Sequence, residues 1–353
     1  MGRGRGTQGR AADPMRIAIV TDAWEPQVNG VVRTLQMVRG ELERAGHAVL
    51  VLSPDAWPSL PCPGYGEIRL ALATSGQVGK RLRSFAPDAI HIATEGTLGL
   101  AARRWCLRAN LPFTTAYHTH FPDYVSARTG LPATWFWRYE RWFHGPAASV
   151  LAATPSLRQQ LAAEGIGPTV PFGRGVDLAN FSADTPPHAA YAALPRPIQL
   201  YVGRVAVEKN IEAFLATRHP GTRVVVGDGP ARKPLERLFP DVIFLGALRG
   251  AALASAYAGA DVFVFPSRTD TFGMVLIEAL ASGVPVAAYP VQGPIDIVTP
   301  ETGCLDDDLD VAIAEALGKD RTVCAAYGRS FSWERAAAEF RGALVPLNPL
   351  IAA

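Results

Sequence analysis

The amino-acid sequence predicts an α/β protein made of two Rossmann-like, doubly wound parallel-sheet domains that face each other across a cleft. Short runs of Val, Ile, Leu and Phe alternate with helical patterns along the whole chain. Continuous apolar runs indicate strands buried on both faces, and the helices between them indicate parallel pairing. Two of these runs, RIAIVTD at 16–22 and IQLYVGR at 198–204, each have the character of a first strand, which indicates two domains.

The expected strands form two series. The first comprises 16–21, 48–52, 88–92, 113–117 and 148–152, and the second comprises 198–202, 223–226, 242–245, 261–265 and 285–288. The Pro-rich stretch between the two series is typical of a linker. We therefore expect a tail at 1–14, an N-terminal domain at 15–180, a linker at 181–197 and a C-terminal domain at 198–330, with a helix at about 331–345 that packs back on the N-terminal domain.

Composition excludes several classes of protein. Apolar residues make up 48% of the 353 residues and charged residues 19%, which excludes a disordered chain. Apolar runs stay well below the ~18 residues of a membrane span. The basic segment 1–14 has no apolar stretch behind it, so we expect a tail and not a secretory signal. Cys62, Cys106, Cys304 and Cys324 lack CxxC spacing, which indicates a reducing cytoplasm and no structural zinc.

The net charge of +2 conceals an uneven distribution. Residues 15–197 hold 17 basic and 13 acidic side chains, whereas residues 198–353 hold 14 and 18. The sequence therefore predicts a basic N-terminal half and an acidic C-terminal half.

Two loops that follow first strands carry candidate ligand-binding residues, because ligands of doubly wound sheets bind beyond the carboxyl ends of the strands. Asn29-Gly30 opens a helix and would leave backbone N–H groups free for an anionic or hydroxyl-rich ligand, although this pattern alone favours an ordinary strand–turn–helix connection. In the second loop, Gly203 allows close backbone approach, and Arg204 and Lys209 can neutralise a diphosphate.

A third loop follows the expected strand 261–265. It holds Asp270, and a helix then carries Glu278 two turns further on. Carboxylates at this spacing can accept hydrogen bonds from sugar and ribose hydroxyls, while the helix N-terminus at 272–274 faces a phosphate. The alternative is an Asp that caps an amphipathic helix and a Glu that faces solvent. From these residues alone, both interpretations stay open.

These loops, together with GRVAVEKN, VGDGP, DTFGMVLIEALASGVPV and FSWERAAAEF, resemble the retaining glycosyltransferases of family 4, which have the GT-B fold. The resemblance covers 15–345. Its hallmark is a pair of carboxylates separated by seven residues, here Asp270 and Glu278. The first is Asp where Glu is commonest, and its shorter reach bears on the donor sugar. The resemblance implies a hexosyltransferase that needs no metal and no cofactor besides its nucleotide-diphosphate sugar donor.

The resemblance also implies roles for individual residues of the donor site. Arg204 and Lys209 would hold the donor diphosphate, Glu278 the ribose, and Asp270 the sugar hydroxyls. Further positions match the family as a cradle for sugar and phosphates, namely Gly30, Gly203 and the backbone amides of Phe272, Gly273 and Met274.

Two histidines and a run of aspartates are further candidates for the site. His118 matches its active-site histidine and is preferred to His120, and the two together make a poor metal pair. The run Asp306–Asp308 precedes a helical pattern, so we expect it to cap a helix and not to bind a metal.

The acceptor is expected to contact the basic half. Basic clusters occur at 80–83 and 103–108, and the run 135–143 holds six aromatic residues. Such a run either packs in the core or lies at a membrane interface, and the charge bias favours an anionic membrane. The hypothesis is a bacterial enzyme, cytoplasmic and peripheral on the inner face of the cell membrane, that transfers from GDP-mannose or a UDP-glucose or UDP-glucuronate donor to a lipid.

Two alternatives differ in function. They are a nonhydrolysing sugar epimerase, which shares the GT-B plan, and a two-lobed small-molecule binding protein without catalysis. A dinucleotide-dependent oxidoreductase is disfavoured because GxGxxG follows neither opening strand. No nucleic-acid partner is expected.

Overall fold

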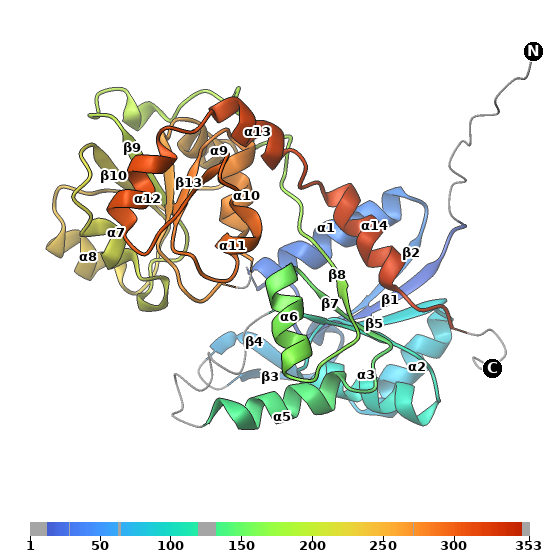
Figure 1. Cartoon of the computed structure of the whole chain (residues 1–353). Coiled ribbons are helices and arrows are strands. Elements are labelled where there is room, and N and C mark those ends of the chain that lie inside the picture. Colours follow the sequence, from blue (N-terminus) through green and yellow to red (C-terminus); the bar gives the residue numbers. More distant parts are fainter. Residues whose placement is uncertain (1–12, 28, 63–64, 119–131, 271, 348–353) are drawn as a thin grey trace, which may run out of the picture.

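The computed structural model describes residues 13–27, 29–62, 65–118, 132–270 and 272–347 (Figure 1). It contains two α/β domains, each built on a six-stranded sheet whose neighbouring strands pair in parallel. The strand order is β2-β1-β5-β6-β7-β8 in one sheet and β11-β10-β9-β12-β13-β14 in the other. The predicted fold class is therefore confirmed.

The N-terminal domain combines this sheet with flanking helices and a small hairpin. The sheet strands are β1 (Arg16–Val20), β2 (Ala48–Leu52), β5 (Ala89–Ile92), β6 (Thr114–Tyr117), β7 (Ser149–Ala152) and β8 (Thr169–Pro171). The helices are α1 (Gly30–Arg44), α2 (Ser75–Phe85), α3 (Thr97–Arg108), α5 (Ala133–His144) and α6 (Pro155–Ala163). An antiparallel hairpin, β3 (Ser59–Cys62) and β4 (Tyr65–Ala71), lies outside the sheet.

The C-terminal domain repeats the plan. Its strands are β9 (Ile198–Val202), β10 (Thr222–Val226), β11 (Ile243–Gly246), β12 (Val262–Phe265), β13 (Val286–Ala288) and β14 (Gly303–Leu305). Its helices are α7 (Ile211–Leu215), α8 (Arg232–Leu238), α9 (Gly250–Ala258), α10 (Met274–Ala281), α11 (Pro294–Ile297), α12 (Leu309–Ala316) and α13 (Arg321–Gly328). The last helix of the chain is α14 (Trp333–Ala343).

Strand β1 shows why the apolar runs indicate buried parallel strands. Ile17 and Ile19 belong to a core cluster on one face of the sheet, and Ala18 and Val20 belong to a cluster on the other face. Successive side chains of a strand point to opposite faces, so a strand covered on both sides needs apolar residues at every position.

Helix α14 returns to the N-terminal domain after the C-terminal domain is complete, and lies beside α1 (Figure 1). Trp333 and Phe340 of α14 are buried in the same core cluster as Leu35 of α1. The polypeptide therefore passes between the two domains twice.

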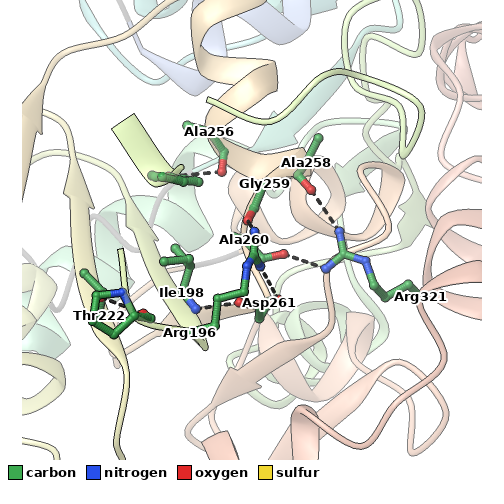
Figure 2. Close-up of polar contacts among 11 residues, drawn as sticks. Arg196, Ile198, Thr222, Ala256, Ala258, Gly259, Ala260, Asp261 and Arg321 are labelled. Atoms are coloured by element: carbon green, nitrogen blue, oxygen red, sulfur yellow. Dashed lines mark hydrogen bonds and ion pairs between the residues drawn. The ribbon is translucent and has the colours of Figure 1, made fainter. Parts of the chain in front are cut away.

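The start of β9 is fixed by an ion pair and a hydrogen bond to Asp261, which precedes the neighbouring strand β12 (Figure 2). Nη1 of Arg196 lies 2.6 Å from Oδ1 of Asp261, and Oδ2 of Asp261 accepts a hydrogen bond of 2.6 Å from the backbone N–H of Ile198. Arg321 of α13 donates to the backbone oxygen of Ala258 at the end of α9, at 3.0 Å. These contacts anchor the beginning of the central strand, whose opposite end leads into the candidate site.

Candidate active site

The buried carboxylate of Glu278 lies where the two domains meet. Glu278 is 3% exposed, its Oε2 accepts a hydrogen bond of 3.1 Å from the Tyr257 hydroxyl, and its Oε1 lies 2.8 Å from Nη1 of Arg33 on α1. A solvent-facing Glu278, the alternative that the sequence left open, is therefore wrong. Burial raises the pKa of Glu278, although Arg33 and Tyr257 act in the opposite direction.

Helix α10, which carries Glu278, begins with an unusual backbone conformation. Gly273, its N-cap, has φ +82°, and a Cβ there would lie 2.9 Å from Cδ1 of Leu276. Only glycine adopts this conformation without strain. The helix N-terminus has no side-chain cap, so Asp270 does not cap it. Phe272 is buried and Met274 is half-buried at the same end of the helix.

Lys209 and Asp270 are adjacent although 61 residues separate them in the sequence. Nζ of Lys209 lies 2.6 Å from Oδ1 and 2.8 Å from Oδ2 of Asp270, and each side chain is about one quarter exposed. The side chain of Asn210 donates to the backbone oxygen of Pro266 at 3.1 Å, which ties the loop after β9 to the loop after β12. The structure thus brings a predicted diphosphate cation and a predicted sugar-binding acid together.

The loop after β9 also packs tightly against the glycines of VGDGP. A Cβ at Gly227 would lie 1.8 Å from the backbone oxygen of Gly203, so Gly227 has no room for a side chain. The N–H of Gly203 donates to the oxygen of Val226 at 3.0 Å. Arg204, next to Gly203, is exposed to solvent. The short motif therefore positions the loop that holds the predicted cations.

The first turn of α1 departs from the sequence expectation. The side chain of Asn29 accepts hydrogen bonds from the backbone N–H groups of Val31 and Val32, both at 3.0 Å. Two of the N–H groups that the sequence left free for a ligand are thus satisfied by the helix cap itself. Space beside Gly30 is open, because a Cβ there would meet no atom within 4 Å.

His118 follows β6 and contacts a buried arginine. Nη2 of Arg174 lies 3.0 Å from Nδ1 of His118. Burial lowers the pKa of His118 well below its usual value, and Arg174 lowers it further. An arginine only donates, so Nδ1 accepts and the neutral ring carries its proton on Nε2. His120 lies outside the described residues.

A cavity of about 290 Å³ lies between the domains, next to this arginine. Arg174 and Phe272 both line it, so it adjoins residues from both halves of the molecule. At its wall, the backbone N–H of Ser156 donates to Oδ1 of Asp296 at 3.0 Å, a second contact between the domains. Among the predicted site residues in the described chain, Phe272 alone lines this cavity.

The aromatic run on α5 divides between core and surface. Trp137 and Phe143 are buried, whereas Trp135 is 61% and Trp142 53% exposed. Arg103 from α3 lies over the ring of Trp142, with its guanidinium carbon 3.9 Å from the ring centroid. The run is therefore neither wholly core nor wholly surface.

The aspartate run 306–308 caps a helix, as expected. Asp308 is the N-cap of α12, and its side chain accepts a hydrogen bond of 2.9 Å from the backbone N–H of Asp310.

Three residues of the site were missed by sequence reasoning. Arg33 and Tyr257 hold Glu278, and Arg174 holds His118. Each is far in sequence from the group that it contacts and belongs to no recognised motif. For Arg33, the available signal was its position in the sequence, one helical turn after Gly30 at the start of α1.

The carboxyl ends of β1 and β12 lead into α1 and α10, and the Arg33–Glu278 pair joins these helices across the domain boundary. Two parallel-sheet domains that face each other in this way form the GT-B fold, and the family models identify the chain as a glycosyltransferase. Residues 28–180 match Glycosyltransferase Family 4, and residues 196–319 match Glycosyl transferases group 1. The chain belongs to glycosyltransferase family 4.

Individual relatives agree with this assignment. The chain is 36% identical over 318 residues to a GDP-mannose-dependent alpha-mannosyltransferase of Mycolicibacterium smegmatis, a match that covers 83% of this chain and 84% of the relative. It is 28% identical to the alpha-monoglucosyldiacylglycerol synthase of Streptococcus pneumoniae, with 86% and 78% covered. Sucrose-phosphate synthase of Thermosynechococcus elongatus has the same fold, with a TM-score of 0.73, 24% identity, and 93% and 98% of the two chains covered.

None of the helices in the described part of the chain combines the length and the apolar character of a membrane span.

Proposed function

We propose that the protein is a retaining, metal-independent hexosyltransferase that moves a hexose from a nucleotide-diphosphate sugar to a hydroxyl of a membrane lipid. The observation that carries this proposal is the Lys209–Asp270 pair, which joins the loops that follow β9 and β12, with the buried Glu278 on the helix that follows β12. Such a set offers charge for a diphosphate and acceptors for hydroxyls. Family membership favours transfer over the epimerase and the binding protein.

Groups of the donor would replace contacts that the site residues now make with one another. The diphosphate takes the charge of Lys209, with Arg204 from the same loop, and releases Asp270 to accept sugar hydroxyls. The ribose hydroxyls donate to Glu278. The uncapped N-terminus of α10 at Gly273 presents backbone N–H groups to the phosphates and the sugar.

In the transfer step, the bond between the sugar C1 and the diphosphate oxygen breaks, and a bond from C1 to the acceptor oxygen forms on the same face. The acceptor hydroxyl loses its proton to the departing phosphate oxygen. Positive charge at Lys209 and Arg204 stabilises that leaving group. A neutral His118 with its proton on Nε2 suits a hydrogen bond to a donor-sugar hydroxyl.

GDP-mannose is the first donor to test. The relative with 36% identity is a GDP-mannose-dependent mannosyltransferase. UDP-glucose and UDP-glucuronate are the comparison donors, because Asp270 has a shorter reach than the commoner Glu.

A lipid acceptor is supported by the outer face of α5. Trp135, Arg138 and Trp142 are exposed, and their spacing of three and four residues places them on one side of the helix. Exposed Trp with neighbouring cations suits the headgroup region of an anionic membrane. A relative is a diacylglycerol-lipid glycosyltransferase by name. We accordingly place the enzyme at the cytoplasmic face of the membrane.

The test mixes purified protein with each of the three donors and with vesicles that contain anionic phospholipid and diacylglycerol. Release of GDP from GDP-mannose that depends on the vesicles, with an α-linked lipid product by NMR, is the expected result. A β-linked product would contradict retention. Failure of all three donors to be consumed or to stabilise the protein would contradict the proposed activity.

A further inference from the structure

Three side chains capable of binding a metal converge in the N-terminal domain, beside the strand β6 that leads into His118. Glu140 and His144 lie four residues apart on α5 and so share one face of that helix. Glu95 comes from the loop between β5 and α3. One ligand atom from each of the three lies within 4.8 Å of the others.

The two distances from the His144 ring nitrogen are compatible with ligands that share a tetrahedral ion. Nε2 of His144 lies 3.2 Å from Oε2 of Glu140 and 3.4 Å from Oε1 of Glu95. Bonds of about 2.0–2.1 Å at tetrahedral angles place ligand atoms about 3.3 Å apart. Nε2 and both carboxylate oxygens of Glu140 are buried and make no hydrogen bond of good geometry, although His144 and Glu140 are close enough for an ion pair. The lone pairs of the His144 nitrogen and the carboxylate oxygens can therefore point to one ion between them.

The surroundings of the cluster orient its ligands as in a metal site. Nδ1 of His144 lies 2.8 Å from Oγ1 of Thr115, which fixes the ring and directs Nε2 toward the carboxylates. The hydroxyl of Tyr139 donates to the backbone oxygen of Glu95 and holds that loop. Glu140 is 1% exposed, but the Glu95 side chain is 26% exposed and leaves an entry path.

The local charge also favours a cation. Two carboxylates, from Glu95 and the buried Glu140, approach the same imidazole nitrogen of His144. A divalent ion would compensate the charge of these two carboxylates.

We propose that Glu95, Glu140 and His144 bind one Zn²⁺ ion, with water as the fourth ligand on the Glu95 side. One imidazole nitrogen and two carboxylate oxygens form a donor set that zinc accepts. The ion would clamp α5 to the β5–α3 loop and stabilise the N-terminal domain. This departs from our sequence expectation, which considered cysteines and closely spaced histidines, whereas Glu95 is 45 residues from Glu140.

The test uses the full-length protein without an affinity tag. It is stripped with a chelator, dialysed against micromolar Zn²⁺, and assayed for bound zinc by mass spectrometry and for its thermal midpoint. We expect about one zinc per chain and a raised midpoint, because an ion that binds the folded state alone stabilises it. Less than about one zinc per ten chains, without a shift in midpoint, would show a buried His–Glu ion pair instead.

Variants locate the ion. Glu140→Gln and Glu95→Gln should each abolish stoichiometric zinc, whereas Glu41→Gln, a buried glutamate on α1 paired with Arg44, should keep it. Unchanged zinc in the first two variants would overturn the proposal. If a variant fails to fold, Co²⁺ added to stripped wild-type protein decides: intense visible bands of tetrahedral cobalt, abolished by Zn²⁺, support the site, and their absence contradicts it.

Discussion

Charged side chains of the donor site neutralise one another in the structure. Lys209 is paired with Asp270, and Glu278 with Arg33. In the proposed complex, the diphosphate would give Lys209 a new anionic partner, and the ribose would add hydrogen bonds to Glu278. Because these charged groups are already paired, the cost of holding them ready is kept low before the donor arrives.

Lys209→Ala should lower turnover by ~10²-fold or more, the usual loss when one charge-stabilising group of an active site is removed. The same holds for Arg204→Ala. Steady-state nucleotide release measures the effect, and Lys233→Ala, an exposed lysine on α8, is the matched control. Near-normal turnover in both site variants would show that the loop after β9 does not bind the diphosphate.

Arg33→Ala should move the acid limb of the pH profile of kcat/KM to higher pH. Arg33 lowers the pKa of the buried Glu278, so its loss raises that pKa and leaves less ionised Glu278 at a given pH. Arg39→Ala is the control, since Arg39 lies on the same helix with an equally exposed side chain and pairs with Glu43. An unshifted limb in Arg33→Ala would mean that ionised Glu278 is not required.

At the scale of elements, the sequence predicted the strands that are rich in β-branched and apolar residues. It missed β8, β14 and the β3–β4 hairpin. Thr169-Val170-Pro171 is short and ends in proline, and only its pairing with β7 makes it a strand. The contacts of Arg33, Tyr257 and Arg174 could not be predicted either, because they depend on how distant elements pack and not on local pattern.

Helix α5 carries the prediction for membrane binding. A double variant, Trp135→Ser with Trp142→Ser, should weaken binding to anionic vesicles by about tenfold or more, because burial of a large apolar side chain contributes about 1.5–3 kcal/mol. Vesicle co-sedimentation measures it. Leu238→Ser removes a side chain that is equally exposed but lies in the C-terminal domain, and should have no effect. Equal binding by both variants and the wild type would exclude this face of α5 as the contact.

At the scale of the whole molecule, the two domains differ in charge and are bridged by polar and apolar contacts. The Arg33–Glu278 pair and the Ser156–Asp296 contact both bridge the domains. The basic half carries the proposed membrane face, and the acidic half carries the donor site. A ligand that binds Glu278 therefore also affects the contact between the two domains.

GDP should raise the thermal midpoint by more than UDP at the same concentration. A ligand at 100 times its Kd stabilises the folded state by ~2.7 kcal/mol, so the base that binds tighter gives the larger shift. Differential scanning fluorimetry over a range of concentrations measures the shift. A larger shift with UDP would redirect the search to UDP-glucose and UDP-glucuronate.

The return of α14 to the first domain has a consequence for biosynthesis. Trp333 and Phe340 fill the core beside Ile17, so that core is incomplete while the chain is synthesised through the whole second domain. Domains generally fold as they leave the ribosome, the first one earliest. Here the C-terminal domain has all its strands before the N-terminal domain has its last helix. The domain that begins first is thus the domain that finishes last.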